Sequence, residues 1–388
     1  MKANKKIEPL PFPVYYWAVA GTAFLGLADA VYLAISHYRV YTDIGYKSFC
    51  AVSKSINCDT VSQSPYSIFL GVPVPVWGVV GYLFFLLLLY PSRNASPKEA
   101  RLWPTLFTIS LCYSLYSIIL ALISMLYIHS YCIMCIASYA VNFALLYLTW
   151  LLHRRFGKKT IIAGLKDDLF YLQEKKKKSA VALIMLIATG ILLPQIFPAY
   201  WKMSKVPSNT TLSHGTTADG HPWIGAEHAK LVIVEFTDYQ CFQCKKMHFY
   251  LRELMNSYPD KIKLVHRNFP MDHQYNPIVK EPYHTGSGKL ALLALYAAEK
   301  NKFWEINDRL YTIDRRTGHF NIRKMARAAG FDVYEFASAT RNRALLRRLE
   351  EDIITGIKLG VTATPSYLVD GEVYLGNLPA NIINKAIE

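Results

Sequence analysis

Charged residues are almost absent from five long stretches in the first half of the sequence. They make up 18% of the 388 residues overall, yet few or none occur in residues 14–36, 71–90, 103–127, 132–152 and 179–201. Each stretch reaches the roughly 20 residues that cross a hydrocarbon core of about 30 Å as a helix. The scarcity of charge therefore predicts five transmembrane helices followed by a soluble domain.

The N-terminal segment lacks the small-residue cleavage site of a secretory signal, although MKANKK precedes an apolar run. The run is also longer than the apolar core of a signal peptide. We therefore expect a retained first transmembrane helix.

Basic residues are scarce on one side of the predicted bundle. The loop of residues 37–70 carries three and the turn of residues 129–131 none, whereas the segments on the other side carry fifteen. By the positive-inside rule, the N-terminus lies in the cytoplasm, and five crossings place the C-terminal domain on the extracytoplasmic side.

The basic residues also lack the interleaved aromatic residues of a single-strand nucleic-acid groove. The net charge is +15, but the runs RRFGKK and EKKKK flank predicted membrane helices, where they contact anionic lipid. We expect the lipid bilayer, and no nucleic acid, as a partner.

The sequence has only seven cysteines, and this topology places all except Cys112 on the outer side: Cys50, Cys58, Cys112, Cys132, Cys135, Cys241 and Cys244. Paired cysteines in an oxidising compartment are usually structural disulfides. A Cys-x-x-Cys disulfide, however, closes too short a loop to stabilise much, and at a helix N-terminus it supports thiol exchange. The two Cys-x-x-Cys pairs therefore favour redox chemistry.

Neither Cys-x-x-Cys pair has a further His or Cys beside it at ligand spacing. A four-sulfur zinc site would need the two pairs to meet. One pair is expected at the membrane surface and the other in a separate domain, so we expect no metal, and a metal-binding or bracing role is kept as an alternative.

The C-terminal region contains a strand, a short turn and a helix that begins at a cysteine pair, in LVIVEFTDYQCFQCKKMHFYLRELMNSYP. A helix N-terminus stabilises a thiolate, so Cys241, the more N-terminal and exposed thiol, is the expected nucleophile and Cys244 the resolving thiol. A second strand, KIKLVHRNFP, a helical region from residue 288 to about 359, a hairpin and a closing helix are expected to follow.

This order of elements resembles the DsbA-like branch of the thioredoxin superfamily, over residues 225–388. The resemblance implies an α/β thioredoxin fold with a helical insertion, CFQC as the active motif and a cis bond before Pro365 beside it. It also makes Glu235 the buried acid that moves a proton, although a strand-edge carboxylate is an alternative. The middle pair, Phe242-Gln243, lacks the Pro or His common in oxidants, which leaves the redox potential open.

Residues 10 to 152 resemble the vitamin K epoxide reductase family, specifically its bacterial fusions to a thioredoxin-like domain. The likeness rests on FCAVSKSINCDTVSQS between the first two spans and on CIMC at the start of the fourth. It implies that Cys50 and Cys58 are a shuttle pair, that Cys132 and Cys135 lie beside a quinone, and that Ser64 and Tyr139 belong to the quinone site.

Helical spacing supports this quinone site independently. Cys132, Cys135, Tyr139 and Asn142 stand at i, i+3, i+7 and i+10, which is one face of a helix. Such a face often serves helix packing alone. The two redox cysteines on it favour the interpretation that this face forms the wall of a pocket. Val74 stands where some animal members carry a quinone-contacting Asn, so epoxide chemistry is not supported.

Two residues within the spans remain unassigned. Asp29 lies in the first span, where an acid is costly enough to be a functional candidate unless it reaches the outer interface. Cys112 in the third span is expected to be a small packing residue.

The sequence thus predicts a four-helix membrane bundle in residues 1–152. A basic cytoplasmic loop, a fifth helix at about 179–201 and a linker fill residues 153–224, and the thioredoxin-fold domain fills residues 225–388. The expected function is a thiol oxidase of the bacterial cytoplasmic membrane. It would form disulfides in reduced exported proteins and pass electrons to ubiquinone or menaquinone of the membrane pool. A reductase or isomerase that runs electrons outward is the main alternative.

Overall fold

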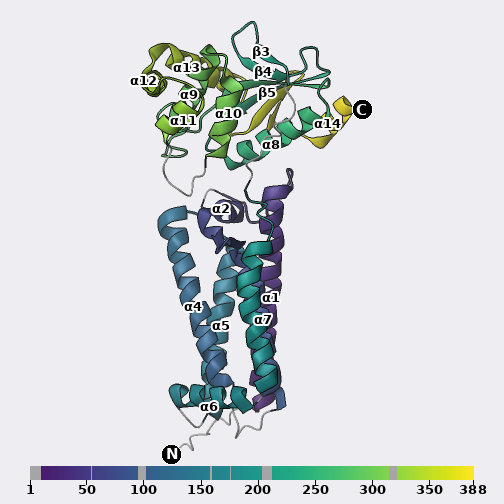
Figure 1. Ribbon diagram of the computed structural model, residues 1–388, viewed down its shortest axis with the longest axis vertical. Helices are drawn as coiled ribbons and strands as arrows, with labels where there is room; N and C mark the ends of the chain where they lie inside the picture. Colours follow the sequence, from purple (N-terminus) through teal and green to yellow (C-terminus); the bar gives the residue numbers. More distant parts are fainter. Residues whose placement is uncertain are drawn as a thin grey trace, which may run out of the picture. The chain divides into compact units, whose positions relative to one another are not determined.

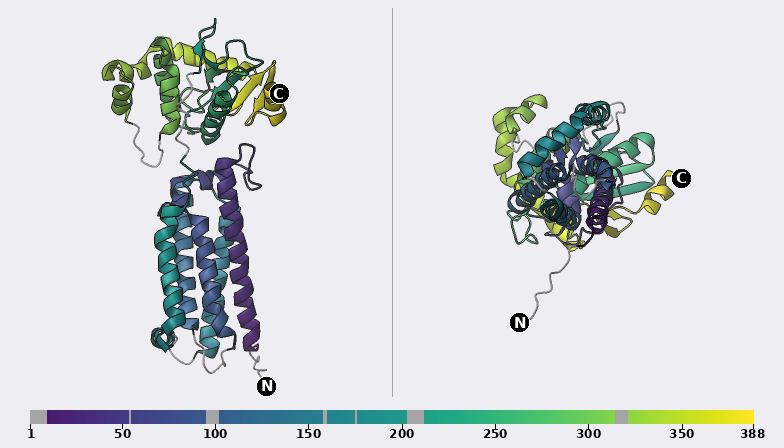
Figure 2. Two further views of the ribbon diagram at one scale, coloured as in Figure 1. Left: turned by 45° about the vertical axis from the view of Figure 1, so that its right-hand side comes forward. Right: turned by 90° about the horizontal axis from the view of Figure 1, so that it is seen from below.

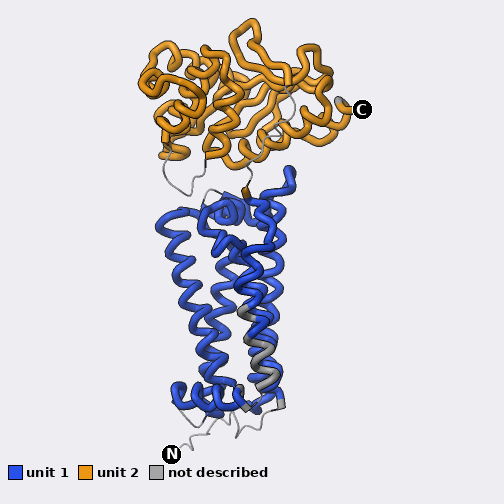
Figure 3. The backbone as a smooth tube through the Cα atoms, in the orientation of Figure 1, with its two compact units in different colours: residues 1–201 blue, residues 202–388 orange. Residues whose placement is uncertain are grey.

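The computed structural model describes residues 10–53, 55–94, 102–157, 160–174, 176–202, 212–313 and 321–388. The chain divides into two compact units, residues 1–201 and residues 202–388 (Figure 3).

The first unit is a bundle of long apolar helices that run side by side (Figures 1 and 2). Within the described residues, four helices are long and apolar enough to cross a membrane: α1 (Phe12–Thr42), α3 (Val74–Leu89), α4 (Trp103–Ile123) and α5 (Ile133–Phe156). A short 3₁₀ turn, Tyr90–Asn94, continues α3, and a π turn, Ser124–Ile128, continues α4. These helices confirm the first four predicted spans.

The fifth predicted span coincides with helix α7 (Lys176–Ile196), which runs along the bundle in Figure 1. It has the length of a crossing, but the crossing itself remains a prediction. The preceding segment, predicted as a basic loop, contains helix α6 (Ile161–Glu174), which lies across the end of the bundle. The buried carboxylate of Asp168 holds α6 there, because it accepts hydrogen bonds from the backbone amides of Leu102 and Thr105 at 2.8 and 3.2 Å.

Small residues let the helices of the bundle approach closely. A Cβ on Gly26 of α1 would lie 2.4 Å from the ring of Tyr82 on α3. Close backbone approach at small residues is a common way for membrane helices to pack. Here it fixes the Tyr82 side chain against α1.

Short elements cover the end of the bundle opposite α6. They are α2 (Cys58–Gln63), the 3₁₀ turn Pro65–Ser67 and a small hairpin of β1 (Ile68–Phe69) and β2 (Val72–Pro73). All of them lie in the loop between α1 and α3, which carries the first cysteine pair.

The second unit is built on a mixed sheet. In the described residues its strand order is β3-β4-β6-β5-β7-β8, and only β5 and β6 are parallel. The strands are β3 (His214–Thr216), β4 (Pro222–Gly225), β5 (Leu231–Thr237), β6 (Ile262–Asn268), β7 (Ser366–Val369) and β8 (Glu372–Leu375). The sheet therefore begins before the predicted boundary at residue 225, because β4 pairs with β6.

Helices α8 (Phe242–Ser257) and α14 (Ala380–Ile387) complete the thioredoxin-like core. The predicted helical region is not continuous. Its described part forms five helices, α9 (Ser287–Glu299), α10 (Phe303–Thr312), α11 (Ile322–Ala328), α12 (Val333–Ser338) and α13 (Arg343–Lys358). Asn321, Asp332 and Asn342 cap three of them with side-chain oxygens, which fixes where those helices start. The predicted insertion, hairpin and closing helix are confirmed.

Candidate functional site

The cysteine pair of the second unit lies at the start of α8. Cys241 is the N-cap residue, and its sulfur accepts a hydrogen bond from the Cys244 amide at 3.2 Å. The Cys241 thiol donates to the carbonyl of Thr364 at 3.3 Å, and the Thr364–Pro365 peptide bond is cis, as predicted. Cys241 is 8% exposed and Cys244 1% exposed, so Cys241 is the more accessible thiol although both are buried.

The environment favours the thiolate of Cys241. Burial raises the pKa of this thiol, but the hydrogen bond with Cys244 and the positive charge of His284 outweigh burial and lower the pKa to about 7. Burial raises the pKa of Cys244 well above its usual range, and the neighbouring Cys241 raises it further. The pair therefore divides into one thiol poised to ionise and one that stays protonated.

A buried carboxylate organises the loop before Cys241. Asp238 accepts hydrogen bonds from the amides of Gln240 and Met271 at 2.5 and 2.6 Å, and from the Ser287 hydroxyl at 2.9 Å. It also pairs with His284 Nδ1 at 3.0 Å. Burial raises the pKa of Asp238, but the His284 contact and the amide hydrogen bonds outweigh it, so the net pKa is lowered and the carboxylate stays ionised.

Neither Asp238 nor His284 was predicted from the sequence. Asp238 stands in a loop where an acid usually serves a turn. His284 is 43 residues after Cys241, in an irregular segment without periodicity. Only the fold brings the two together.

Glu235 lies on β5, which β6 and β7 flank, so the alternative of a strand-edge carboxylate is wrong. It is 1% exposed and pairs with Nδ1 of the buried His266 at 2.8 Å. Its register partner Tyr367 is fully buried, with a hydroxyl that has no hydrogen-bond partner among the described residues. A role for Glu235 in proton movement remains a prediction.

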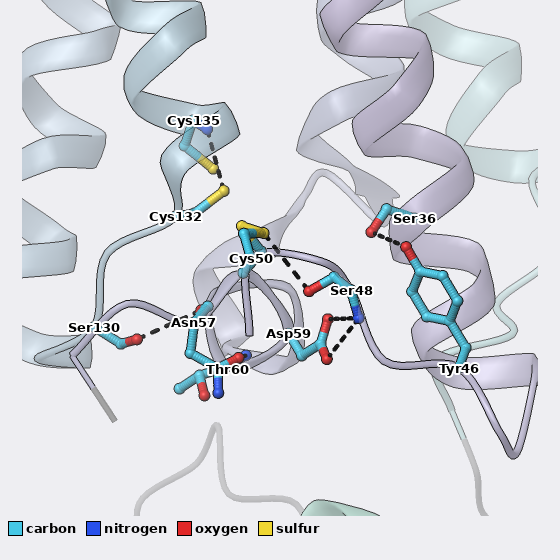
Figure 4. The surroundings of a disulfide bond; sticks show 11 residues. Ser36, Tyr46, Ser48, Cys50, Asn57, Asp59, Thr60, Ser130, Cys132 and Cys135 are labelled. Carbon is cyan, nitrogen blue, oxygen red and sulfur yellow. Dashed lines mark hydrogen bonds between the residues drawn. A yellow bond between two sulfur atoms is a disulfide. The ribbon is translucent and has the colours of Figure 1, made fainter. Parts of the chain in front are cut away.

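The two cysteine pairs of the first unit form one cluster. Cys50 and Cys58 are joined by a disulfide with a Cα–Cα distance of 5.7 Å. Both are buried together with Cys132, and Cys135 packs against them. In Figure 4 the Cys132 sulfur points toward Cys50 on one side and has Cys135 on the other. The fold therefore assembles two pairs that are more than 70 residues apart in the sequence.

Backbone hydrogen bonds hold this cluster together. The amide of Asn57 donates to the carbonyl of Tyr131 at 2.9 Å, and the amide of Tyr131 donates to the carbonyl of Ser55 at 2.7 Å. Asn57 also caps α2 through its side chain, and α2 begins at Cys58. Cys132 caps α5, and its sulfur accepts a hydrogen bond from the Cys135 amide at 3.1 Å (Figure 4).

A cavity of about 490 Å³ opens beside Cys135 within the bundle. Apolar and aromatic side chains from α1, α3, α4 and α5 make up most of its wall. This volume and lining suit a small aromatic ring with an apolar tail, such as an isoprenoid quinone. The predicted residues Ser64, Tyr139 and Asn142 all line the cavity, as does Val74.

Two polar side chains of the cavity wall, Asn142 and Tyr139, already contact other protein groups. The amide of Asn142 is engaged, because its oxygen accepts from Tyr82 at 2.7 Å and its nitrogen donates to Ser117 at 2.9 Å. Asn142 therefore ties α3, α4 and α5 together at the cavity wall. The Tyr139 hydroxyl interacts with Ser124, another residue of the wall.

Two further residues, Cys112 and His37, lie at the cavity wall. Cys112, expected to be a small packing residue, is an exposed free thiol that borders the cavity. His37 also lines it; this fully buried side chain contacts the Tyr200 hydroxyl at 2.7 Å and the Ser67 hydroxyl at 3.2 Å. A single His on an apolar helix gives no signal of such a position in the sequence.

Two family models match the chain, one for each unit. Residues 17–150 match the vitamin K epoxide reductase family, and residues 217–388 match a thioredoxin family. The cysteine cluster and the cavity fall in the first match, and Cys241 with Cys244 falls in the second. A domain of each kind is therefore present in one chain.

The curated proteins that are similar to this chain match only part of it. The Na(+)/H(+) antiporter NhaA of Herminiimonas arsenicoxydans is 26% identical over 164 residues, which are 42% of this chain and 24% of that protein. NhaA 1 of Mycolicibacterium gilvum is 25% identical over 166 residues, 42% of this chain and 25% of that protein. The chain spans about a quarter of the length of these curated relatives.

Solved structures with partial similarity include a thioredoxin-like oxidoreductase from Silicibacter pomeroyi, at 24% identity and a TM-score of 0.35, over 43% of this chain and 90% of that chain. The oxidised form of BdbD from Bacillus subtilis has 19% identity and a TM-score of 0.36, over 46% of this chain and 97% of that chain. The family models, rather than these structures, identify the two domains.

Proposed function

We propose that this chain, which joins a vitamin K epoxide reductase domain to a thioredoxin-like domain, is a membrane thiol oxidase. It forms disulfides in exported proteins and passes the electrons to a membrane quinone. The observation that carries the proposal is the contact of two cysteine pairs beside an apolar cavity. Thiols arrive from water and the quinone arrives from lipid, and this arrangement serves both.

The second unit takes electrons from the substrate. A substrate thiolate attacks Cys241 of a Cys241–Cys244 disulfide, and a second substrate thiol releases the substrate as a disulfide. Cys241 and Cys244 retain the two electrons and two protons as thiols. The lowered pKa of Cys241 makes it the better leaving group in this exchange and the nucleophile in the next one.

The first unit passes the electrons inward. Cys241 attacks Cys50 of the loop disulfide, Cys244 resolves the mixed disulfide, and Cys58 is released as a thiolate. Cys58 then attacks Cys132 of a Cys132–Cys135 disulfide, and Cys50 resolves this second mixed disulfide. The loop disulfide is restored, and Cys132 and Cys135 carry the electrons.

The quinone, when bound, supplies an acceptor for two electrons and two protons. Cys135 faces the cavity and lies nearer to it than Cys132, which is buried against the loop disulfide. Tyr139 and Ser64 would orient the ring through their hydroxyls, and Asn142 would keep the wall in place. The aromatic lining keeps water from the reacting sulfur.

The direction of electron flow is part of the proposal. A thiolate-favouring Cys241 stabilises the reduced form of the pair relative to unperturbed thiols, which supports the oxidase direction. A reductase or isomerase that receives electrons is the alternative. The proposed location is the bacterial cytoplasmic membrane, with the N-terminus inside and every cysteine pair on the extracytoplasmic side.

The test uses the purified full chain in detergent, supplied with a reduced unfolded protein and a soluble quinone. Quinone consumption and disulfide formation in equal amounts are expected. Cys135→Ala should abolish quinone reduction and leave exchange at Cys241 intact. Reduction of a disulfide substrate by quinol would support a reductase or isomerase. Bound metal without quinone reduction would support a metal-binding protein.

A further inference from the structure

The proposed electron relay gives no role to Asp29, an acid of the membrane unit. Asp29 lies in α1, within an apolar helix that is long enough to cross a membrane. Acids within membrane helices are costly and are usually retained for a function. Asp29 forms no ion pair among the described residues, so charge pairing does not explain it.

The two carboxylate oxygens of Asp29 have different surroundings. Oδ2 accepts a hydrogen bond from the Ser138 hydroxyl of α5. Oδ1 is buried and has no hydrogen-bond partner among the described residues. An unsatisfied buried oxygen is costly, and Oδ1 of Asp29 is therefore available to accept a proton or a donor.

Ser138 connects Asp29 to the reaction site. It follows Cys135 by three residues, so the two side chains share one face of α5. Ser138 and Cys135 both line the cavity. The Ser138 hydroxyl, which can both donate and accept, therefore lies on the cavity side of the helix that carries the redox sulfur and is hydrogen-bonded to a carboxylate.

The titratable groups that face Asp29 come from two helices. Tyr82 of α3 and Cys132 and Cys135 of α5 interact with it electrostatically. The Tyr82 hydroxyl is committed to Asn142. Asp29 thus has one oxygen without a hydrogen-bond partner among the described residues, and its other oxygen accepts from Ser138, which lines the cavity.

Oxidation of the Cys132 and Cys135 thiols requires that protons move. When their disulfide forms, the two thiols lose two electrons and two protons, and the reduced quinone gains both. We propose that Asp29, through the Ser138 hydroxyl, accepts the proton that leaves the Cys135 thiol and returns it to a quinone oxygen. The Cys132 thiol gives the second proton, which the other quinone oxygen takes up. Asp29 accepts one proton and returns it, so it ends each cycle unchanged.

This inference rests on the proposed function, and the test separates the two. Asp29→Asn keeps a side-chain oxygen that can accept from Ser138, but it cannot take up a proton. We expect oxidation of prereduced Cys132 and Cys135 by quinone in a single turnover to slow by roughly 10²-fold, the usual scale of general acid–base catalysis. Exchange from Cys241 through Cys50 to Cys132 should keep its normal rate.

The matched controls lie on the same two helices. Asp43→Asn, at the end of α1, removes an acid paired with Arg39 on the surface and should leave the quinone step unchanged. Asp29→Glu should restore much of the rate, and Ser138→Ala should slow the step while Ser138→Thr does not. Equal slowing of quinone reduction and thiol exchange in Asp29→Asn, or no slowing at all, would overturn the proposal.

A second readout does not depend on quinone. The infrared difference spectrum between the thiol and disulfide states, recorded without quinone, should contain the band of a carboxyl group that changes its protonation. This band should shift in deuterated water and be absent from Asp29→Asn. If the normal protein fails to reduce quinone, the relay fails, and the band still decides whether Asp29 exchanges a proton with the cysteines. A spectrum identical in Asp29→Asn contradicts the proposal.

Discussion

His284 Nδ1 lies 3.0 Å from the buried carboxylate of Asp238, three residues before Cys241. The amide of Gln240, next to Cys241, donates to the same carboxylate, and the Gln240 side chain donates to the carbonyl of Thr285. The irregular segment before α9 is therefore fastened to the cysteine loop at two points. A histidine far away in the sequence thereby helps to set the chemistry of the cysteine.

We predict that alkylation of Cys241 rises with pH with a midpoint near 7. Below this pH the thiol holds its proton, and above it the thiolate is the reactive form. His284→Gln keeps a hydrogen-bond donor for Asp238 but removes the positive charge, so the midpoint should move to higher pH. Mass spectrometry of the Cys241 peptide after timed labelling measures both midpoints.

The His284→Gln variant should also make the Cys241–Cys244 disulfide a weaker oxidant. Each pKa unit by which the thiolate is destabilised lowers the reduction potential by about 30 mV. His221→Gln is the control, since that histidine pairs with Asp219 and Asp352 rather than with Asp238. An unchanged midpoint in His284→Gln would show that the His284 charge has no influence on Cys241.

Cys244→Ala should trap a covalent link between Cys241 and Cys50. In the proposed relay Cys244 resolves the mixed disulfide between Cys241 and Cys50, and without Cys244 this disulfide should persist. Digestion without reductant and mass spectrometry identify the joined peptides. A link from Cys241 to Cys112 or Cys132, with none to Cys50, contradicts the proposed order of the relay.

The orientation of the chain predicts where single cysteines can be labelled. In a chain without other cysteines, Glu227→Cys on the second unit should react with an impermeant maleimide in intact cells. Lys166→Cys on α6 should react only after lysis, since α6 is predicted to lie inside. Both residues are exposed, so access through the membrane alone separates them. The reverse pattern would overturn the topology and the function with it.

Tyr139→Phe should raise the KM for quinone or slow its reduction, by up to roughly tenfold for a loss of about 1.4 kcal/mol. The ring and its packing remain, and only the hydroxyl that faces the cavity is lost. Thiol exchange among the cysteines should continue at its normal rate. Tyr147→Phe, on an exposed part of α5, is the control. Normal quinone kinetics in a folded Tyr139→Phe protein would remove Tyr139 from the site.

Local periodicity explains what the sequence predicted well. Cys135, Tyr139 and Asn142 line the same cavity because a helix repeats every 3.6 residues, whatever the fold around it. The strand and helix around Cys241 follow in the same way from alternation and amphipathicity. Such patterns depend only on neighbours in the chain.

Residues whose role depends on distant contacts were not predictable. Ser138 faces Asp29 only because α1 and α5 pack together, and His284 reaches Asp238 only because the helical insertion folds back. Helix α6 was missed because basic residues flank it on both sides, and such a segment suits a membrane-flanking loop equally well. What holds it in place is Asp168, which finds its partners more than 60 residues away.

The hydrogen bond between Asn57 and Tyr131 also bears on the kinetics of the relay. Each of these residues immediately precedes a cysteine, so Cys58 and Cys132 are each attached one peptide unit from the same contact. In the proposed relay, exchange between these two sulfurs therefore takes place within one packed cluster, at a high effective concentration and without a diffusive search. The preceding step, in which Cys241 must encounter Cys50, depends on diffusion of the second unit. The length of the linker between the two units can therefore set the overall turnover.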